Sequence, residues 1–233
     1  PCYHSEHHIF GATYAAAAIT NSIENTDPFA IKNELQRWNE KNNSEITLDE
    51  FSEILQIVFA THDLGNLTKT DQITMNNGEI TLDYADSFQL ELTTTEERSA
   101  QIALKLIAEF DPQRKITEPM KRLLKHLIMQ TVFRGETTQS EEPFWLVVQT
   151  VDQIGTHYFS NYPIWQAVSG ILNEQFALPE NKRRQQPHLK PFLHFLPNRL
   201  AALFPNAEIR KDILAIFDPE NKKSSIMNQI AAE

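Results

Sequence analysis

Cysteine and glycine are scarce in this chain. Its 233 residues include one cysteine, Cys2, and six glycines. A single cysteine excludes an internal disulfide framework and fits a reducing compartment, so we expect a cytoplasmic protein. Few glycines, combined with long apolar periodicities, favour helices over a strand-and-turn architecture.

Basic charge and long apolar runs are also lacking. Lys and Arg number 21 against 31 Asp and Glu, giving a formal net charge of -10. This balance argues against a nucleic-acid duplex as partner, because neutralising phosphates needs clustered basic residues. No run of about 18 apolar residues exists, so no membrane segment is expected. The first residue is Pro1 rather than methionine, which indicates a fragment or a trimmed product, and a targeting segment upstream stays open.

What the chain does contain is apolar residues at helical spacing. We expect an all-α fold in a single domain over residues 1–233. The predicted helices cover 9–19, 47–63, 94–110, 119–133 and 143–155, followed by tail helices around 195–204, 208–217 and 224–233. Two of these starts carry capping boxes, Thr47 with Glu50 and Thr94 with Glu97.

One stretch breaks the helical pattern. The sequence QITMNNGEITLDY has two β-rich arms around Asn-Gly, which is a strong short hairpin signal. We therefore predict a hairpin near residues 72–84, within an insertion over 64–95. Such an insertion is either a lid or binding loop, or a surface decoration. The basic cluster at 181–190 is predicted to be a solvated loop.

Three histidines stand near the start of the chain, in PCYHSEHHIF. His4 and His8 are four apart and would share one face of a helix, with Ala12, Ala15 and Ile19 on the same side as His8. Histidine is the commonest metal ligand and ionises near neutral pH. The cluster is therefore a metal site, a purification-tag scar or a polar helix start.

Two further helices end their apolar stripes in ionisable groups. His62 closes one stripe and is followed by Asp63, and Asp152 closes another. Taken singly, His62 could be a satisfied core histidine and Asp152 could cap a helix or pair with an arginine. Burying an unpaired carboxylate costs several kcal/mol, however. A divalent metal would compensate both carboxylates and accept neutral imidazole as well.

The order H…HD…D on successive helices resembles the HD superfamily of metal-dependent phosphohydrolases. YHSEHH is similar to the YHN-x-x-H opening of cyclic-nucleotide phosphodiesterases and small bacterial HD hydrolases, and TEERSAQIA resembles an N-E-x-x-S-A segment of the latter. The match covers about residues 3–155. It implies an HD-type helical bundle with its metal-site core there and a helical extension over 156–233.

The resemblance implies hydrolysis of a phosphodiester or nucleotide phosphate bond in a small substrate, such as a nucleotide or cyclic nucleotide. It assigns a divalent ion (Mn, Mg, Zn, Fe or Ni) to one tight site, with a second ion only if Asp63 bridges. The implied metal ligands are His8, His62, Asp63 and Asp152. The implied catalytic residues are His4 as proton donor, Asp63 as orienting base and Glu96.

Candidate substrate contacts are less specific. They are His126, Gln130, Asn66 and Gln149, with Arg98 and Arg134 as further phosphate contacts or plain surface residues. His126 is more readily explained as a buried structural histidine. Asn66 departs from phosphodiesterases, which have histidine at that position, and the HD-GYP signature is absent. The alternative function is thus a non-catalytic, metal-bound sensing or protein-interaction module. A di-iron oxygenase is disfavoured because only His126 lies between the HD pair and Asp152. Oligomeric state stays open.

Overall fold

The chain folds into an all-α structure. The computed structural model describes residues 6–66, 72–76, 79–83, 94–132, 142–159 and 198–221. Its helices are α1 (Glu6–Ser22), α2 (Ile31–Asn42), α3 (Leu48–Thr61), α4 (Thr95–Phe110), α5 (Glu118–Met129), α6 (Pro143–Thr150), α7 (Thr156–Phe159) and α10 (Ala207–Phe217). Two short turns of other helical types are η1 (Leu64–Asn66) and η2 (Val151–Gly155).

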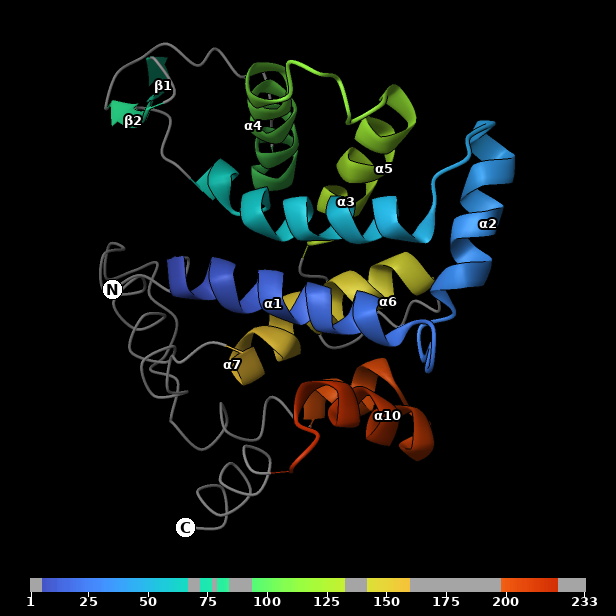
Figure 1. Ribbon diagram of the computed structural model, residues 1–233. Helices are drawn as coiled ribbons and strands as arrows, with labels where there is room; N and C mark the ends of the chain where they lie inside the picture. Colours follow the sequence, from blue (N-terminus) through green and yellow to red (C-terminus); the bar gives the residue numbers. More distant parts are fainter. Residues whose placement is uncertain are drawn as a thin grey trace, which may run out of the picture.

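Helices α1 and α3 form the centre of the fold and run antiparallel beside each other (Figure 1). The predicted inner face of α1 is confirmed, because Ala12, Ala15 and Ile19 are fully buried. Small alanine side chains let the neighbouring backbones approach closely. The start of α1 therefore lies beside the end of α3.

Helix α3 begins and packs as its sequence predicts. Thr47 and Glu50 form the expected capping box, with the Thr47 side chain accepting from the Glu50 N–H. The stripe Phe51, Ile54, Leu55 and Val58 is fully buried. It faces a core to which α1 and α5 also contribute, while α4 and α5 lie on the other side of α3 from α1 (Figure 1).

Helix α2 was missed by the sequence prediction. Its sequence, IKNELQRWNEKN, is mostly polar, and it buries only Ile31 and Leu35. Its N-cap residue, Ala30, is in a left-handed conformation (φ 56°) and provides no side-chain acceptor. The Asp27 carboxylate accepts from the Ile31 and Lys32 N–H groups instead. With a narrow apolar stripe and the capping side chain displaced from its usual position, the start and periodicity signals are too weak to identify the helix.

The predicted helix over 143–155 is interrupted. Helix α6 ends at Thr150 and the chain continues through the π-helical turn η2 into α7. A π turn widens the helix by one residue and changes the direction of the side chains that follow. Periodicity predicted that Trp145, Val148 and Asp152 lie on one face of a continuous α-helix. The π turn begins at Val151, just before Asp152, so the regular helical spacing ends there.

The remaining elements are a two-stranded sheet, α4 and the C-terminal helices. Strands β1 (Gln72–Asn76) and β2 (Glu79–Asp83) pair antiparallel, with Asn76 opposite Glu79. Helix α4 carries its predicted capping box at Thr94, and α10 begins after Asn206, whose side chain accepts from the Glu208 N–H. Residues 198–203 are also helical. The predicted loop 181–190 and tail helix 224–233 lie outside the described residues.

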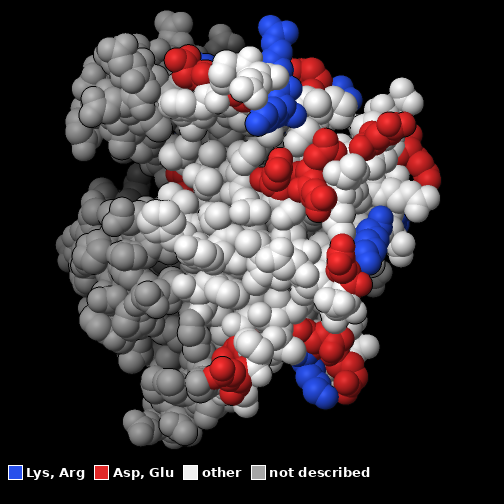
Figure 2. Space-filling view, viewed as in Figure 1, with Lys and Arg blue, Asp and Glu red and all other residues white. Residues whose placement is uncertain are grey.

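The outer face of α1 is uncharged beyond Glu6. Phe10 and Tyr14 are exposed on it. Figure 2 shows charged side chains mainly toward the edges of this view, with a broad area free of them across the middle. Among the described helices, none combines the length and apolar character needed to cross a bilayer.

The Thr47→Ala variant tests whether the capping box stabilises α3. Losing the hydroxyl acceptor leaves the Glu50 N–H without its cap, so the free energy of unfolding should fall by about 1 kcal/mol. Urea denaturation followed by circular dichroism measures this. Thr47→Ser keeps the acceptor and should retain most of the stability; an equal loss in both variants would contradict the capping role.

Candidate metal centre

Two histidines from distant parts of the chain meet at the junction of α1 and α3. His8 lies in the first turns of α1, and His62 follows the last residue of α3 as its C-cap. Both side chains are buried, and their Nε2 atoms are 3.4 Å apart. Asp63 adds a carboxylate, with Oδ2 3.3 Å from each of these nitrogens. This group of three could hold a metal ion.

Asp152 brings a second carboxylate to the same two nitrogens. Its Oδ1 lies 3.1 Å from His8 Nε2 and 3.2 Å from His62 Nε2. The carboxylate comes from η2, 90 residues after His62. The four side chains that the sequence predicted as metal ligands are therefore brought together at one place.

The distances fit a metal ion. Three atoms separated by 3.1–3.4 Å can all lie about 2.0–2.2 Å from one point, as zinc bonds to imidazole nitrogen and carboxylate oxygen require. The donor set of two imidazoles and two carboxylates also suits manganese, iron or nickel. The side chains of Asp63 and Asp152 are 12% and 18% exposed, so the group reaches solvent on its carboxylate side.

The ring of His62 is oriented for this role by its own helix. Its Nδ1–H donates to the Phe59 carbonyl at 3.2 Å. That bond places the proton on Nδ1 and leaves Nε2 directed at the cluster. Metal-ligating histidines are commonly fixed this way, with the other ring nitrogen donating to a carbonyl or carboxylate.

The turn that carries His62 and Asp63 is held by the start of α4. The Ser99 hydroxyl donates to the His62 carbonyl and accepts from the Gly65 N–H at 2.8 Å. Arg98 Nε donates to the Gly65 carbonyl at 2.9 Å. A Cβ on Gly65 would lie 1.9 Å from the Thr95 carbonyl oxygen, so only glycine allows this approach. Arg98, a candidate phosphate contact, is thus used in positioning the turn.

Close packing also brings Asp152 to His8. A Cβ built on Gly155 would lie 2.6 Å from Cβ of Ala15, which means that η2 and α1 touch almost backbone to backbone. A larger residue at either position would push the turn away from the helix. The alanine-rich face of α1 therefore sets the separation at which Asp152 meets His8.

Charge within the cluster shifts two pKa values in opposite directions. Burial alone lowers the pKa of His62, but its hydrogen bond to Asp152 and the charges of Asp152 and Asp63 outweigh this and raise the pKa of His62 to about 9. Burial raises the pKa of Asp152, but hydrogen bonds and charge from His62 and His8 hold that pKa well below its usual range. Without metal, an imidazolium and a carboxylate compensate each other.

His126 belongs to a different part of the structure, and Gln130 Nε2 lies 3.5 Å from its Nε2. The His126 ring lies beside Trp38 (4.8 Å between centroids) and Phe144 (6.2 Å), and its Nε2 is 3.4 Å from Glu142. Phe144 stacks on Phe51 near the start of α3, 11 residues before His62, which corresponds to about 16 Å of helix. This placement gives His126 no direct contact with the cluster.

The other candidate residues have separate positions. The Gln149 side chain is buried, and its Nε2 donates to the Gln130 carbonyl at 2.7 Å. Glu96 lies in the first turn of α4 and forms no hydrogen bond or ion pair with the four described cluster side chains. His4 and Arg134 lie outside the described residues, and so does the side chain of Asn66.

Sequence reasoning missed two supporting residues. Ser99 lies within the TEERSA segment, in which the family resemblance selects Glu96. The buried Ser99, however, is the residue of this segment that binds the turn after α3. Arg199 is buried within the C-terminal helical residues 198–203, where it was expected to be part of an ordinary helix. The available signal was a single arginine within the largely apolar stretch FLPNRLAALF.

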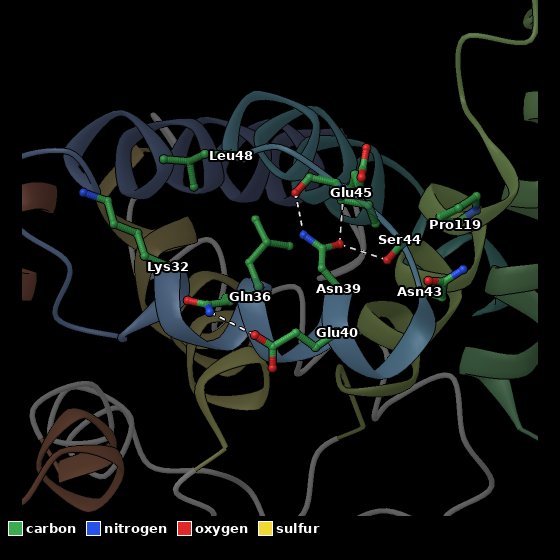
Figure 3. A pocket seen from close by; sticks show the side chains of 11 residues that line it. Lys32, Gln36, Asn39, Glu40, Asn43, Ser44, Glu45, Leu48 and Pro119 are labelled. Carbon is green, nitrogen blue, oxygen red and sulfur yellow. Dashed lines mark hydrogen bonds between the residues drawn. The ribbon is translucent and has the colours of Figure 1, made fainter.

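A separate groove lies between α2 and the start of α3. It has a volume of about 780 Å³ and is lined by residues including Lys32, Gln36 and Glu40 (Figure 3). Asn39, also in its wall, uses its amide to hold the α2–α3 connection, since it binds the Ile46 N–H and carbonyl. None of the four cluster residues lines this groove, so it is distinct from the metal centre.

Comparison with known proteins found no matching family model, no similar curated protein and no similar solved structure.

Metal affinity should depend on pH through His62. A proton and a metal ion compete for Nε2, so affinity falls as pH falls below the pKa of about 9. Between pH 7 and pH 8 the affinity for Zn²⁺ should therefore rise about tenfold, with release of about one proton per ion at pH 7. Competition with a chelating dye measures the affinity. A flat profile above pH 7, as for an ordinary histidine, would contradict the shift.

Gly65→Ala should disrupt the turn after α3. The added methyl group would overlap the Thr95 carbonyl, so the turn must move and carry His62 and Asp63 with it. We expect at least about tenfold weaker Zn²⁺ binding, the lower end of the effect of supporting residues at metal sites. Ala60→Ser adds one atom on the exposed face of α3 and should bind Zn²⁺ as the wild type does. Unchanged Zn²⁺ binding in Gly65→Ala would contradict the role of this turn in positioning His62 and Asp63.

Proposed function

We propose that this protein is a metal-dependent phosphohydrolase of the HD type, cleaving a phosphodiester or nucleotide phosphate bond. The observation that carries the proposal is that Asp63 Oδ2 and Asp152 Oδ1 each lie 3.1–3.3 Å from the Nε2 atoms of both His8 and His62. In chain order these residues read H…HD…D, on α1, directly after α3 and on η2. The all-α fold with these ligands on helix ends is consistent with an HD-type bundle.

The composition of the site supports hydrolysis rather than electron transfer. Imidazole and carboxylate ligands suit a divalent ion acting as a Lewis acid. When bound, such an ion supplies polarisation of a phosphoryl oxygen and a water of lowered pKa. The partly exposed carboxylate side of the cluster is the proposed access for a small phosphorylated substrate, of which nucleotides and cyclic nucleotides are the proposed class.

The chain's own residues then have distinct tasks. Asp63 adjoins both imidazoles and accepts a proton from the attacking water as the new P–O bond forms. His4, one helical turn before His8 in sequence, donates a proton to the leaving oxygen as the old P–O bond breaks. Positioned acids and bases of this kind contribute about 10²–10⁴-fold each. Glu96 is proposed to bind water near the site.

The alternative function is a metal-binding module without catalytic activity. Asn66 follows the HD pair at a position where phosphodiesterases have histidine, and Glu96 forms no hydrogen bond or ion pair with the four described cluster side chains. Both features favour a metal-bound sensing or protein-interaction module that holds the ion without turnover. The two proposals share the metal centre and differ only in catalysis.

Asp63→Asn tests catalysis at the centre. The amide keeps the shape of the side chain but cannot take a proton, so turnover with Mn²⁺ should fall by at least about 10²-fold. Nucleotides, cyclic nucleotides, cyclic dinucleotides and a generic phosphodiester form the substrate panel. Asp49→Asn changes an exposed carboxylate on the same helix and should leave turnover unchanged.

The result separates the two functions. Turnover that requires Asp63 but not Asp49 supports the hydrolase. Absence of turnover across the panel, in a protein that holds about one ion per chain, favours the sensing module. A protein that binds no ion would contradict both.

A further inference from the structure

A buried arginine lies beneath the turn that carries Asp152. Arg199 is 3% exposed and comes from the C-terminal helical residues 198–203. Its Nε donates to Gln153 Oε1 at 2.6 Å, and its Nη2 reaches Gln149 Oε1 at 3.4 Å. A buried guanidinium is costly unless its donors are satisfied. These contacts therefore tie the C-terminal segment to η2.

The two glutamines stand on either side of Asp152. Gln149 precedes it by about one helical turn, and Gln153 is the next residue. Gln153 Nε2 donates to Gln149 Oε1, and Gln149 Nε2 donates to the Gln130 carbonyl at the end of α5. Both side chains are buried. Hydrogen bonds thus run from α5 through α6 and η2 to the C-terminal segment.

Apolar packing holds the same turn at a second point. A Cβ on Gly155 would lie 3.0 Å from Phe217 Cζ, so the Phe217 ring of α10 lies directly against the backbone there. Phe217 also stacks on Tyr158, with 5.8 Å between ring centroids. A π turn is rare within α-helices and often occurs at functional sites, and the contacts with Phe217 hold this one in place.

We propose that residues 198–217 form a clamp that sets the position of Asp152 in the metal centre, with Arg199 as its positioning residue. Arg199 acts through Gln153 and not as a ligand. The inference rests on the proposed metal centre and extends it, because metal affinity becomes dependent on docking of the C-terminal segment. Events that displace this segment would then regulate the site from a distance.

Arg199→Met in the full chain tests the clamp. Methionine keeps much of the length and volume but donates nothing to Gln153 or Gln149. Zn²⁺ affinity, measured by competition with a chelating dye below the unfolding temperature, should fall by about 10–100-fold. Arg199→Lys retains one charged donor and should lose less. In Co²⁺-loaded protein the visible spectrum of Arg199→Met should shift, because Asp152 ligation changes.

Two controls separate positioning from general stability. Ile46→Ala removes buried side-chain volume before α3, at the end opposite His62, and should lower the melting temperature with unchanged Zn²⁺ affinity and Co²⁺ spectrum. Arg37→Met makes the same substitution at an exposed arginine of α2, where it removes an ion pair with Glu34 outside the C-terminal segment, and should also bind normally.

The outcomes are distinct. Wild-type affinity in folded Arg199→Met overturns the clamp, and so does an equal loss of affinity in Ile46→Ala. If Arg199→Met does not fold, Arg199→Lys decides: a partial loss with a shifted Co²⁺ spectrum supports the clamp, and wild-type behaviour overturns it. A wild-type chain that binds no Zn²⁺ contradicts the metal centre itself, whereas binding that ignores Arg199 contradicts the clamp alone.

Discussion

The carboxylates of Asp63 and Asp152 both contact the buried imidazoles of His8 and His62. The surrounding elements are arranged so that these four ionisable groups stay close together. Like charges so close to each other require a cation or proton between them. In the metal-free protein His62 supplies that proton, which is why its pKa is raised. A divalent ion would replace the proton and compensate both carboxylates at once.

Holding these groups together needs rigid support on each side. The turn that carries His62 and Asp63 is fixed by hydrogen bonds to the Ser99 hydroxyl and by the absence of a side chain at Gly65. The Asp152 turn is held against α1 by the Gly155–Ala15 contact. Small residues stand at both contacts because backbone must approach backbone before the longer ligand side chains can meet.

The C-terminal segment is therefore connected to the site. Its Arg199 and Phe217 contact η2 at Gln153 and Gly155, the residues that follow Asp152. By contrast, His126 lies near the start of α3 and the groove beside α2 is lined by other residues, so polar character alone does not mark the functional region. The candidate metal ligands lie at or near the end of α3, whereas His126 and the groove lie near its start.

Residue order alone predicts the all-α class, the capping boxes at Thr47 and Thr94, and the buried faces of α1 and α3. These are local properties, because periodicity and caps act within one or two helical turns. It also singled out His8, His62, Asp63 and Asp152, since ionisable groups at the ends of apolar stripes conflict with burial. The folded chain was needed to show that these four residues meet, that α2 is a helix despite its weak apolar stripe, and that a π turn carries Asp152. Those outcomes depend on Ala15 against Gly155 and on Arg199 bonding to Gln153, contacts between residues 46 to 140 positions apart that no local pattern encodes.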